Sequence, residues 1–309
     1  MTKRIITGSI LLLVLVPIFL IEVLFPLFNA VIVVLAGIAC YEIVTIRKDI
    51  KVPIFALILI IVLTLFTMIM SSLWMSMGLI SPKYTPFINV IAKYDFYPLF
   101  ALTPFLVMTL FVLIPKFDVE LLGRSLVAIM YIGISFASVV TLRMMGIRFV
   151  IYLFLITILT DMFAYFIGVR FGKHKLAKTV SPKKSWEGAI AGTVMATIIA
   201  SLFALFYDIF KGNLNPEGHM TLLSTFSSLG DLSRGIQALV IVPITMVASV
   251  VGQIGDLIAS KMKRSYDIKD FGVIFPGHGG VIDRFDSTLF VSLFLVVAFM
   301  VIQVVFPNV

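Results

Sequence analysis

The sequence has little of what a soluble protein needs on its surface. Charged residues make up 13% of the 309 residues, against about 25% in soluble domains. There is one cysteine, Cys40, which excludes an intramolecular disulfide and supports no inference about redox compartment. The shortage of charge excludes an ordinary soluble domain.

Long apolar runs are what the chain has instead. Its mean hydropathy is +1.14, and several apolar stretches are long enough to cross a bilayer. We therefore expect an all-α, polytopic integral membrane protein with about nine transmembrane helices. The expected spans are residues 6–26, 28–46, 53–78, 97–115, 122–142, 148–169, 187–210, 235–259 and 287–306.

The charge distribution predicts how the chain is oriented. A net charge of +8 can indicate nucleic acid, but orientation in the bilayer explains it better, so no nucleic-acid partner is expected. A cytoplasmic N-terminus places most of the 24 Lys and Arg residues inside, as the positive-inside rule requires. We divide the chain into N-terminal transmembrane helices, residues 1–146, and a C-terminal transmembrane region, residues 147–309, that holds the polar chemistry.

One segment departs strongly from the apolar background. Ser260 to Asp286 reads SKMKRSYDIKDFGVIFPGHGGVIDRFD and lies between two predicted spans. Ionisable groups beside a membrane core are costly, so such a cluster predicts a functional site. Carboxylates can hold a divalent cation, and lysines and arginines can hold phosphate.

The end of the eighth predicted span carries polar residues at helical spacing. They fall on one helical face and are Gln253, Asp256, Ser260, Lys263 and Arg264. Lysines and arginines at a span end can simply snorkel to the headgroups. That alternative does not account for Asp256, which lies about one turn inside the apolar run, so we favour a functional role for it.

A glycine-rich turn precedes the ninth predicted span. Gly277, Gly279 and Gly280 allow a tight turn whose backbone N–H groups can approach an anion. Asp283 and Asp256, at the ends of two spans, can share a cation. The alternative is an ion-pair network that joins Asp283 and Asp286 to Arg264 and Arg284. His278 is either a general base or, as we favour, hydrogen-bonded within the turn.

The loop between the sixth and seventh spans, residues 168–188, is strongly basic. Ser181, Lys183 and Lys184 come just before a helix start, where anions bind well. A plain loop that contacts anionic headgroups is an equal alternative on charge alone. Asp161, inside the sixth span, either pairs with a lysine of the site or satisfies a neighbouring helix.

These residues carry a resemblance to a known family. The elements Ser260-x-Met262-Lys263-Arg264, Lys269-Asp270 and His278-Gly279-Gly280-x-x-Asp283-Arg284-x-Asp286 match the signature of the CDP-diglyceride synthetases, or phosphatidate cytidylyltransferases. The blocks GQIGD at 252–256, SPKKSWEG at 181–188 and DMFAY at 161–165 also resemble that family. The resemblance covers residues 160–290, and the N-terminal spans agree in apolar character only.

The resemblance implies a reaction and a set of site residues. Phosphatidate attacks the α-phosphate of CTP to give CDP-diacylglycerol and pyrophosphate, with Mg²⁺ required; an additional monovalent cation and a homodimer are left open. Asp256 and Asp283 resemble the metal-binding carboxylates, and both are expected to be catalytic together with Ser260, Lys263, Arg264 and Lys184. Substrate-binding residues are expected at Ser181, Lys183, Lys269, Asp270, His278, Gly279, Gly280, Arg284, Asp286 and Asp161. Two departures are Ala259, where many bacterial members have Glu, and Ser185, where Thr is usual.

Two other classes compete with this interpretation. A lipid kinase or CDP-alcohol phosphotransferase would use related substrates, but the aspartate run of the latter and a G-x-x-x-x-G-K-[ST] loop are absent from the sequence. An ion-coupled transporter would place its acids at midspan, whereas these cluster at one face. We expect an enzyme of a bacterial inner membrane with its active site on the cytoplasmic side.

Overall fold

The computed structural model describes residues 13, 16–47, 52–77, 79, 97–275 and 277–307. The chain forms two compact units. The first unit comprises Met1–Met144 with Ser265–Phe285, and the second comprises Met145–Arg264 with Asp286–Val309. The segment that carries most of the signature, after Arg264, thus packs with N-terminal helices.

The first unit is built from helices that precede α8. Their bounds are η1 Glu22–Leu24, α2 Phe25–Val44, α3 Ile54–Ser76, α5 Tyr97–Leu113, α6 Val119–Val127, the π-helical turn η3 Ala128–Ile132 and α7 Gly133–Met145. Proline in the first turn of α2 fits a helix start, because its missing N–H has no partner there in any case. Buried apolar residues of α2, α3 and η3 form the core, among them Phe28, Ile32, Ile60 and Ile129.

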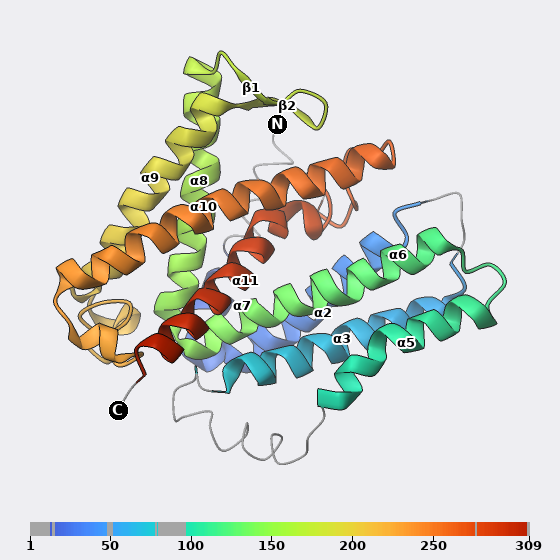
Figure 1. Cartoon of the computed structure of the whole chain (residues 1–309), viewed down its shortest axis with the longest axis horizontal. Helices are drawn as coiled ribbons and strands as arrows, with labels where there is room; N and C mark the ends of the chain where they lie inside the picture. Colours follow the sequence, from blue (N-terminus) through green and yellow to red (C-terminus); the bar gives the residue numbers. More distant parts are fainter. Residues whose placement is uncertain are drawn as a thin grey trace. The chain divides into compact units, whose positions relative to one another are not determined.

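The second unit contains the remaining helices and one hairpin (Figure 1). Its elements are α8 Ile147–Phe171, β1 Lys175–Ala177, β2 Ser181–Ser185, α9 Trp186–Leu205, η4 Tyr207–Ile209, η5 Gly212–Leu214, η6 Ser228–Asp231, α10 Arg234–Ser265 and α11 Ile282–Val305. The first four residues of α11 belong to the first unit. The antiparallel hairpin β1–β2 is the exception to the expected all-α class within the described residues.

Seven helices of the described residues are long and apolar enough to span a membrane. They confirm a polytopic helical membrane protein and correspond to seven of the spans expected from sequence. The span expected at 97–115 corresponds to α5, of which Leu102–Leu113 is described as an apolar helix shorter than a full crossing. The span expected at 6–26 lies partly outside the described residues, which include 13 and 16–26 of it.

Two helices extend beyond the apolar spans expected from sequence, and both extensions matter for the site. α10 continues past the span end at 259 to Ser265, in agreement with the helical spacing through Arg264, because lysine, arginine and methionine are good helix formers. α11 begins at Ile282, before the expected start of the apolar span at 287. Asp283, Arg284 and Asp286 are therefore helical residues in the first turns of α11.

The packing of α9 follows from its four-residue periodicity. Gly188, Gly192, Ala196 and Ala200 lie on one buried face, and α8 approaches it so closely that a Cβ at Gly192 would be 2.6 Å from the Thr160 carbonyl oxygen. Such small-residue faces let membrane helices pack closely. Large side chains cover another face and are exposed, namely Ile190, Val194, Ile198 and Leu202.

Polar contacts join the helices of the second unit. Thr160 on α8 and Ser249 on α10 hydrogen-bond through their hydroxyls at 2.7 Å, and Gln253 donates to the Thr193 hydroxyl at 2.8 Å. Such bonds are favourable where no water competes. They fix the rotation of α10 against α8 and α9, and so determine which face of α10 carries its polar end.

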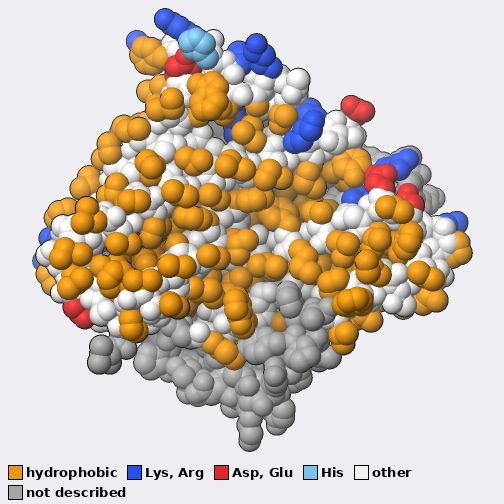
Figure 2. Space-filling model, viewed as in Figure 1, with side chains coloured by type: hydrophobic (Ala, Val, Ile, Leu, Met, Phe, Trp, Pro, Cys, Tyr) orange, Lys and Arg blue, Asp and Glu red, His pale blue; other side chains and the backbone are white. Residues whose placement is uncertain are grey.

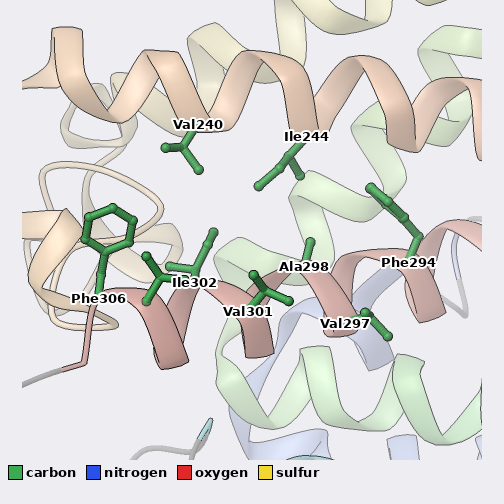
Figure 3. A pocket seen from close by; sticks show the side chains of 9 residues that line it. Val240, Ile244, Phe294, Val297, Ala298, Val301, Ile302 and Phe306 are labelled. Atoms are coloured by element: carbon green, nitrogen blue, oxygen red, sulfur yellow. The ribbon is translucent and has the colours of Figure 1, made fainter.

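An apolar cavity of about 340 Å³ lies between α10 and α11. Val240 and Ile244 face it from α10, and the α11 side chains include Phe294, Val301 and Phe306 (Figure 3). All nine lining residues are apolar, so the cavity offers no catalytic group.

Candidate active site

Lys184 and Asp256 form the centre of the candidate site in the second unit. The Lys184 ammonium, on β2, makes a short ion pair with the Asp256 carboxylate, on α10. Their side chains are 27% and 25% exposed, so the pair is accessible from outside. Two residues that are 72 positions apart in sequence, both expected at the site, are thus brought together.

The hairpin determines which lysine reaches the site. Successive side chains on a strand point to opposite faces, and in β2 Lys183 is exposed whereas Lys184 is half-buried. The strand ends at Ser185, whose hydroxyl caps α9 by accepting the Gly188 N–H at 3.2 Å. Lys, Arg and His side chains gather around this hairpin, whereas hydrophobic side chains cover much of the visible face of α9 and α10 (Figure 2).

Further carboxylates and hydroxyls surround this pair. The Ser260 hydroxyl, one turn along α10, donates to Asp256 Oδ1 at 3.3 Å. Asp161 on α8 interacts electrostatically with Asp256 and Lys184 and accepts a hydrogen bond from the Ser287 hydroxyl at 3.4 Å. Asp286 on α11 interacts electrostatically with Asp256, Lys263 and Asp161.

The cluster brings like charges close to one another. Its three carboxylates are Asp161, Asp256 and Asp286, and the lysines that interact with them are Lys184 and Lys263. Like charges in a partly desolvated setting repel strongly. An additional cation would relieve this repulsion, and a phosphate would be attracted to the lysines.

Asp283 lies in the first unit, where it holds the signature turn. Its Oδ2 atom accepts the backbone N–H of Phe271 at 2.8 Å and that of Gly280 at 2.9 Å. Gly279 has φ of +85°, and a Cβ there would be 2.7 Å from Asp283 Oδ2. Glycine at 279 is therefore required by both backbone conformation and space.

A second carboxylate, Glu42, holds the other side of the same turn. Glu42, near the end of α2, accepts the Val281 N–H on Oε1 at 2.9 Å and the Ile282 N–H on Oε2 at 3.0 Å. The turn was expected to offer its N–H groups to an anion. Those of Gly280, Val281 and Ile282 instead bind carboxylates of the chain itself. The only sequence signal for Glu42 was an acid inside an apolar helix.

His278 lies in the same turn, where its backbone N–H donates to the Phe275 carbonyl at 2.8 Å. Its ring Nδ1 is buried and has no hydrogen-bond partner among the described residues. A role of the ring as a general base, or as a group held within the turn, stays a prediction.

The remaining expected residues are distributed over both units. Exposed side chains are found at Arg264, Lys269, Asp270 and Arg284, and Ser181 is half-buried. Exposed cations are accessible to a nucleotide that arrives from water.

Taken with these sites, the apolar helices define a polytopic membrane protein whose polar chemistry lies near helix ends. The model of the cytidylyltransferase family matches residues 2–303. The chain belongs to this cytidylyltransferase family, which confirms the resemblance seen in the motifs.

Relatives with curated names agree with this membership. A protein of Bacillus subtilis named phosphatidate cytidylyltransferase is 37% identical over 194 residues, which are 62% of this chain and 63% of that protein. Proteins of the same name from Staphylococcus haemolyticus and Staphylococcus aureus are 38% and 36% identical over 166 residues, 54% of this chain and 54% of each protein. The chain thus matches less than two thirds of the length of these relatives.

Proposed function

We propose that this protein is a phosphatidate cytidylyltransferase that transfers CMP from CTP to phosphatidate in phospholipid synthesis. The observation that carries the proposal is the Lys184–Asp256 pair with Ser260, Asp161 and Asp286 around it. Lysine, carboxylate and hydroxyl groups near the ends of apolar helices support the proposed binding of phosphate and a metal ion. Family membership and the names of the relatives support the same activity.

The reaction requires positioning and charge neutralisation more than acid–base chemistry. A phosphate oxygen of phosphatidate attacks the α-phosphorus of CTP. A new P–O bond forms, the bond from the α-phosphorus to the bridging oxygen breaks, and pyrophosphate leaves with that oxygen and the bond's electron pair. The attacking oxygen is already ionised near neutral pH, so no strong base is needed. Fixed cations around the phosphates then supply most of the catalysis.

The residue roles in this proposal follow the motif resemblance and the local contacts. Lys184, Lys263, Arg264 and Ser260 surround the phosphates, and Asp256 orients Lys184 and Ser260 through its ion pair and hydrogen bond. The remaining substrate contacts are proposed at Ser181, Lys183, Lys269, Asp270, His278, Gly279, Gly280, Arg284, Asp286 and Asp161. The structure shows that Gly279 and Gly280 also have structural duties in the turn.

Mg²⁺ is part of this proposal, with Asp256 and Asp283 as its protein ligands. The described residues bring no three acidic, histidine or cysteine side chains together as a metal site, but carboxylate oxygens are the ligand type that a hard cation prefers. Magnesium usually needs only one or two carboxylates, completed by substrate phosphates and water. Two backbone N–H groups hold the Asp283 carboxylate through Oδ2, which fixes the position of this proposed ligand. When bound, the metal would neutralise charge on the transferring phosphate and on pyrophosphate.

The proposed topology has nine spans, a cytoplasmic N-terminus and an active site on the cytoplasmic side of a bacterial inner membrane. Residues 1–146 form its N-terminal transmembrane region, and residues 147–309 form the catalytic region. A cytoplasmic site at span ends can receive CTP from water and phosphatidate sideways from the bilayer. Surface cysteines introduced in the loops at residues 116 and 178 should both react with impermeant reagents only from the cytoplasmic side.

The activity is tested by pyrophosphate release from the purified protein in mixed micelles. We expect release that requires CTP, phosphatidate and Mg²⁺ together. Omission of any one of the three should return the rate to background. Folded protein that releases no pyrophosphate, but moves ions in liposomes, would overturn the proposal in favour of a transporter.

A further inference from the structure

Glu42 is a buried acid that the reaction described above does not use. Its side chain is 4% exposed and lies in the last turn of α2, 239 positions before its first partner, Val281. A buried carboxylate is costly unless its charge is met by good hydrogen bonds. Here each oxygen accepts one backbone N–H, from Val281 and from Ile282. Those two N–H groups belong to the start of α11, which has unsatisfied donors and the positive end of the helix dipole.

The turn is shaped to admit this carboxylate. A Cβ at Gly280 would be 2.6 Å from both Glu42 Cδ and Oε2, and a Cβ at Gly272 would be 3.0 Å from Glu42 Cδ and closer still to Oε1. Two neighbouring glycines, Gly272 and Gly280, thus make room for one side chain. Apolar packing alone would not require the Glu42 carboxylate to lie this close to the backbone of the turn.

The end of α2 is itself fixed by α6. Arg124 on α6 is buried and donates to the Val44 carbonyl at 2.9 Å, which suits a cation at a helix C-terminus. Arg47 forms a short ion pair with Glu120. Tyr266, the first residue after α10, hydrogen-bonds Glu120, and its burial, then the Glu120 charge, raise the pKa of its phenol.

We infer that Glu42 is a positioning residue for the proposed metal-binding carboxylate Asp283. Glu42 binds the N–H groups of Val281 and Ile282, and Asp283 binds those of Phe271 and Gly280. The two carboxylates together fix the turn, so the orientation of the Asp283 side chain depends on Glu42, a residue of α2. This gives the N-terminal region a role in catalysis without contact to substrate. The inference rests on the proposed function.

The test compares Glu42→Gln with Glu22→Gln, the same change at an exposed acid of the same unit. Glutamine keeps the shape but offers one carbonyl oxygen, so one of the two N–H groups meets an NH₂ donor instead. In hydrogen–deuterium exchange of the protein in micelles, the peptide covering residues 271–285 should exchange faster in Glu42→Gln and unchanged in Glu22→Gln. This readout requires neither substrate nor metal.

Kinetics then separate positioning from general damage. We expect Glu42→Gln to lower kcat about 10- to 100-fold, the usual cost of losing a group that orients a metal ligand. The Mg²⁺ concentration for half-maximal rate should rise. KM for CTP should change less than about threefold, because in this proposal Glu42 does not contact CTP and ground-state binding of CTP is unchanged. A loss of active protein alone would leave the Mg²⁺ requirement unchanged, and that result would overturn the inference.

A double-mutant cycle keeps the inference testable if Glu42→Gln folds poorly. Gly272→Ala pushes against the Glu42 carboxylate, so it should reproduce the slow, Mg²⁺-demanding kinetics. In a Glu42→Ala background the obstructed group is gone, so adding Gly272→Ala should cost little more. Fully multiplicative losses would contradict the inference.

The outcomes also separate this inference from the proposed function. Wild-type protein that releases no pyrophosphate would refute the proposed function. Faster exchange in Glu42→Gln with unchanged kcat would refute only the role of Glu42.

Discussion

Asp256→Asn is the substitution that tests the site most sharply. Asparagine has nearly the same shape, keeps one acceptor oxygen, and removes the negative charge that pairs with Lys184 and accepts from Ser260. If Asp256 holds the metal and orients Lys184, the substitution weakens metal binding and also misplaces the lysine, and both effects slow the reaction. If the pair is only structural, its loss acts on stability alone.

The structure separates the magnitudes of these two effects. Both side chains of the pair are about a quarter exposed, so solvent screening limits its contribution to roughly 1 kcal/mol of unfolding free energy. That corresponds to a fall in Tm of about 2–4 °C. Loss of a group that stabilises transition-state charge costs about 10²- to 10³-fold in kcat. We therefore expect at least a hundredfold loss of turnover with a small change in Tm.

The assay measures pyrophosphate release and thermal unfolding on the same preparations. The matched control is Asp208→Asn, which breaks another half-exposed carboxylate–cation pair in the second unit, with Arg234 at 2.7 Å. The control should lose similar stability and keep its turnover. Near-wild-type turnover of folded Asp256→Asn would refute the role assigned to this carboxylate. Asp283→Asn should show a comparable loss.

Three further predictions concern the second unit and the packing of its helices. Lys184→Ala should lower kcat about 100-fold, as loss of a phosphate-binding cation does, and turnover within threefold of wild type would contradict this. Gly192→Ala should lower Tm, since its Cβ would be 2.6 Å from the Thr160 carbonyl oxygen, whereas Gly123→Ala, with nothing within 4 Å, should not. Burial lowers the pKa of His219 below 6.5; the unfolded chain then gains the proton first, so stability should fall as pH drops below about 6.5. His219→Gln should flatten that part of the Tm–pH profile, and an unchanged profile would contradict it.

The membrane helices could be predicted because each is a continuous apolar run. α3 and α8 appear close to their expected positions for that reason. Boundaries were less predictable where charge enters a helix, as at the end of α10 and the start of α11. The hairpin β1–β2 could not be foreseen, because β1 has only three residues and β2 is polar and lacks the alternation that marks a strand.

The site residues could be predicted where local sequence patterns mark them, but not where contacts depend on tertiary packing. Lys184, Asp256 and Ser260 could be proposed because motif spacing and helical periodicity are local properties. The ion pair between the first two could not, since it depends on how β2 packs against α10. Glu42 was beyond reach, because its partners lie 239 and 240 positions away and no pattern in α2 marks it.

The measurement that tests the central claim most directly follows two labels of CTP into products. Purified protein in mixed micelles is given phosphatidate, Mg²⁺ and CTP labelled with ³²P at either the α- or the γ-phosphate. CMP transfer predicts that the α-label enters the lipid fraction in step with phosphatidate consumed, while the γ-label appears only in water-soluble pyrophosphate. The γ-label in lipid would reveal a kinase, and neither label in lipid would contradict the account.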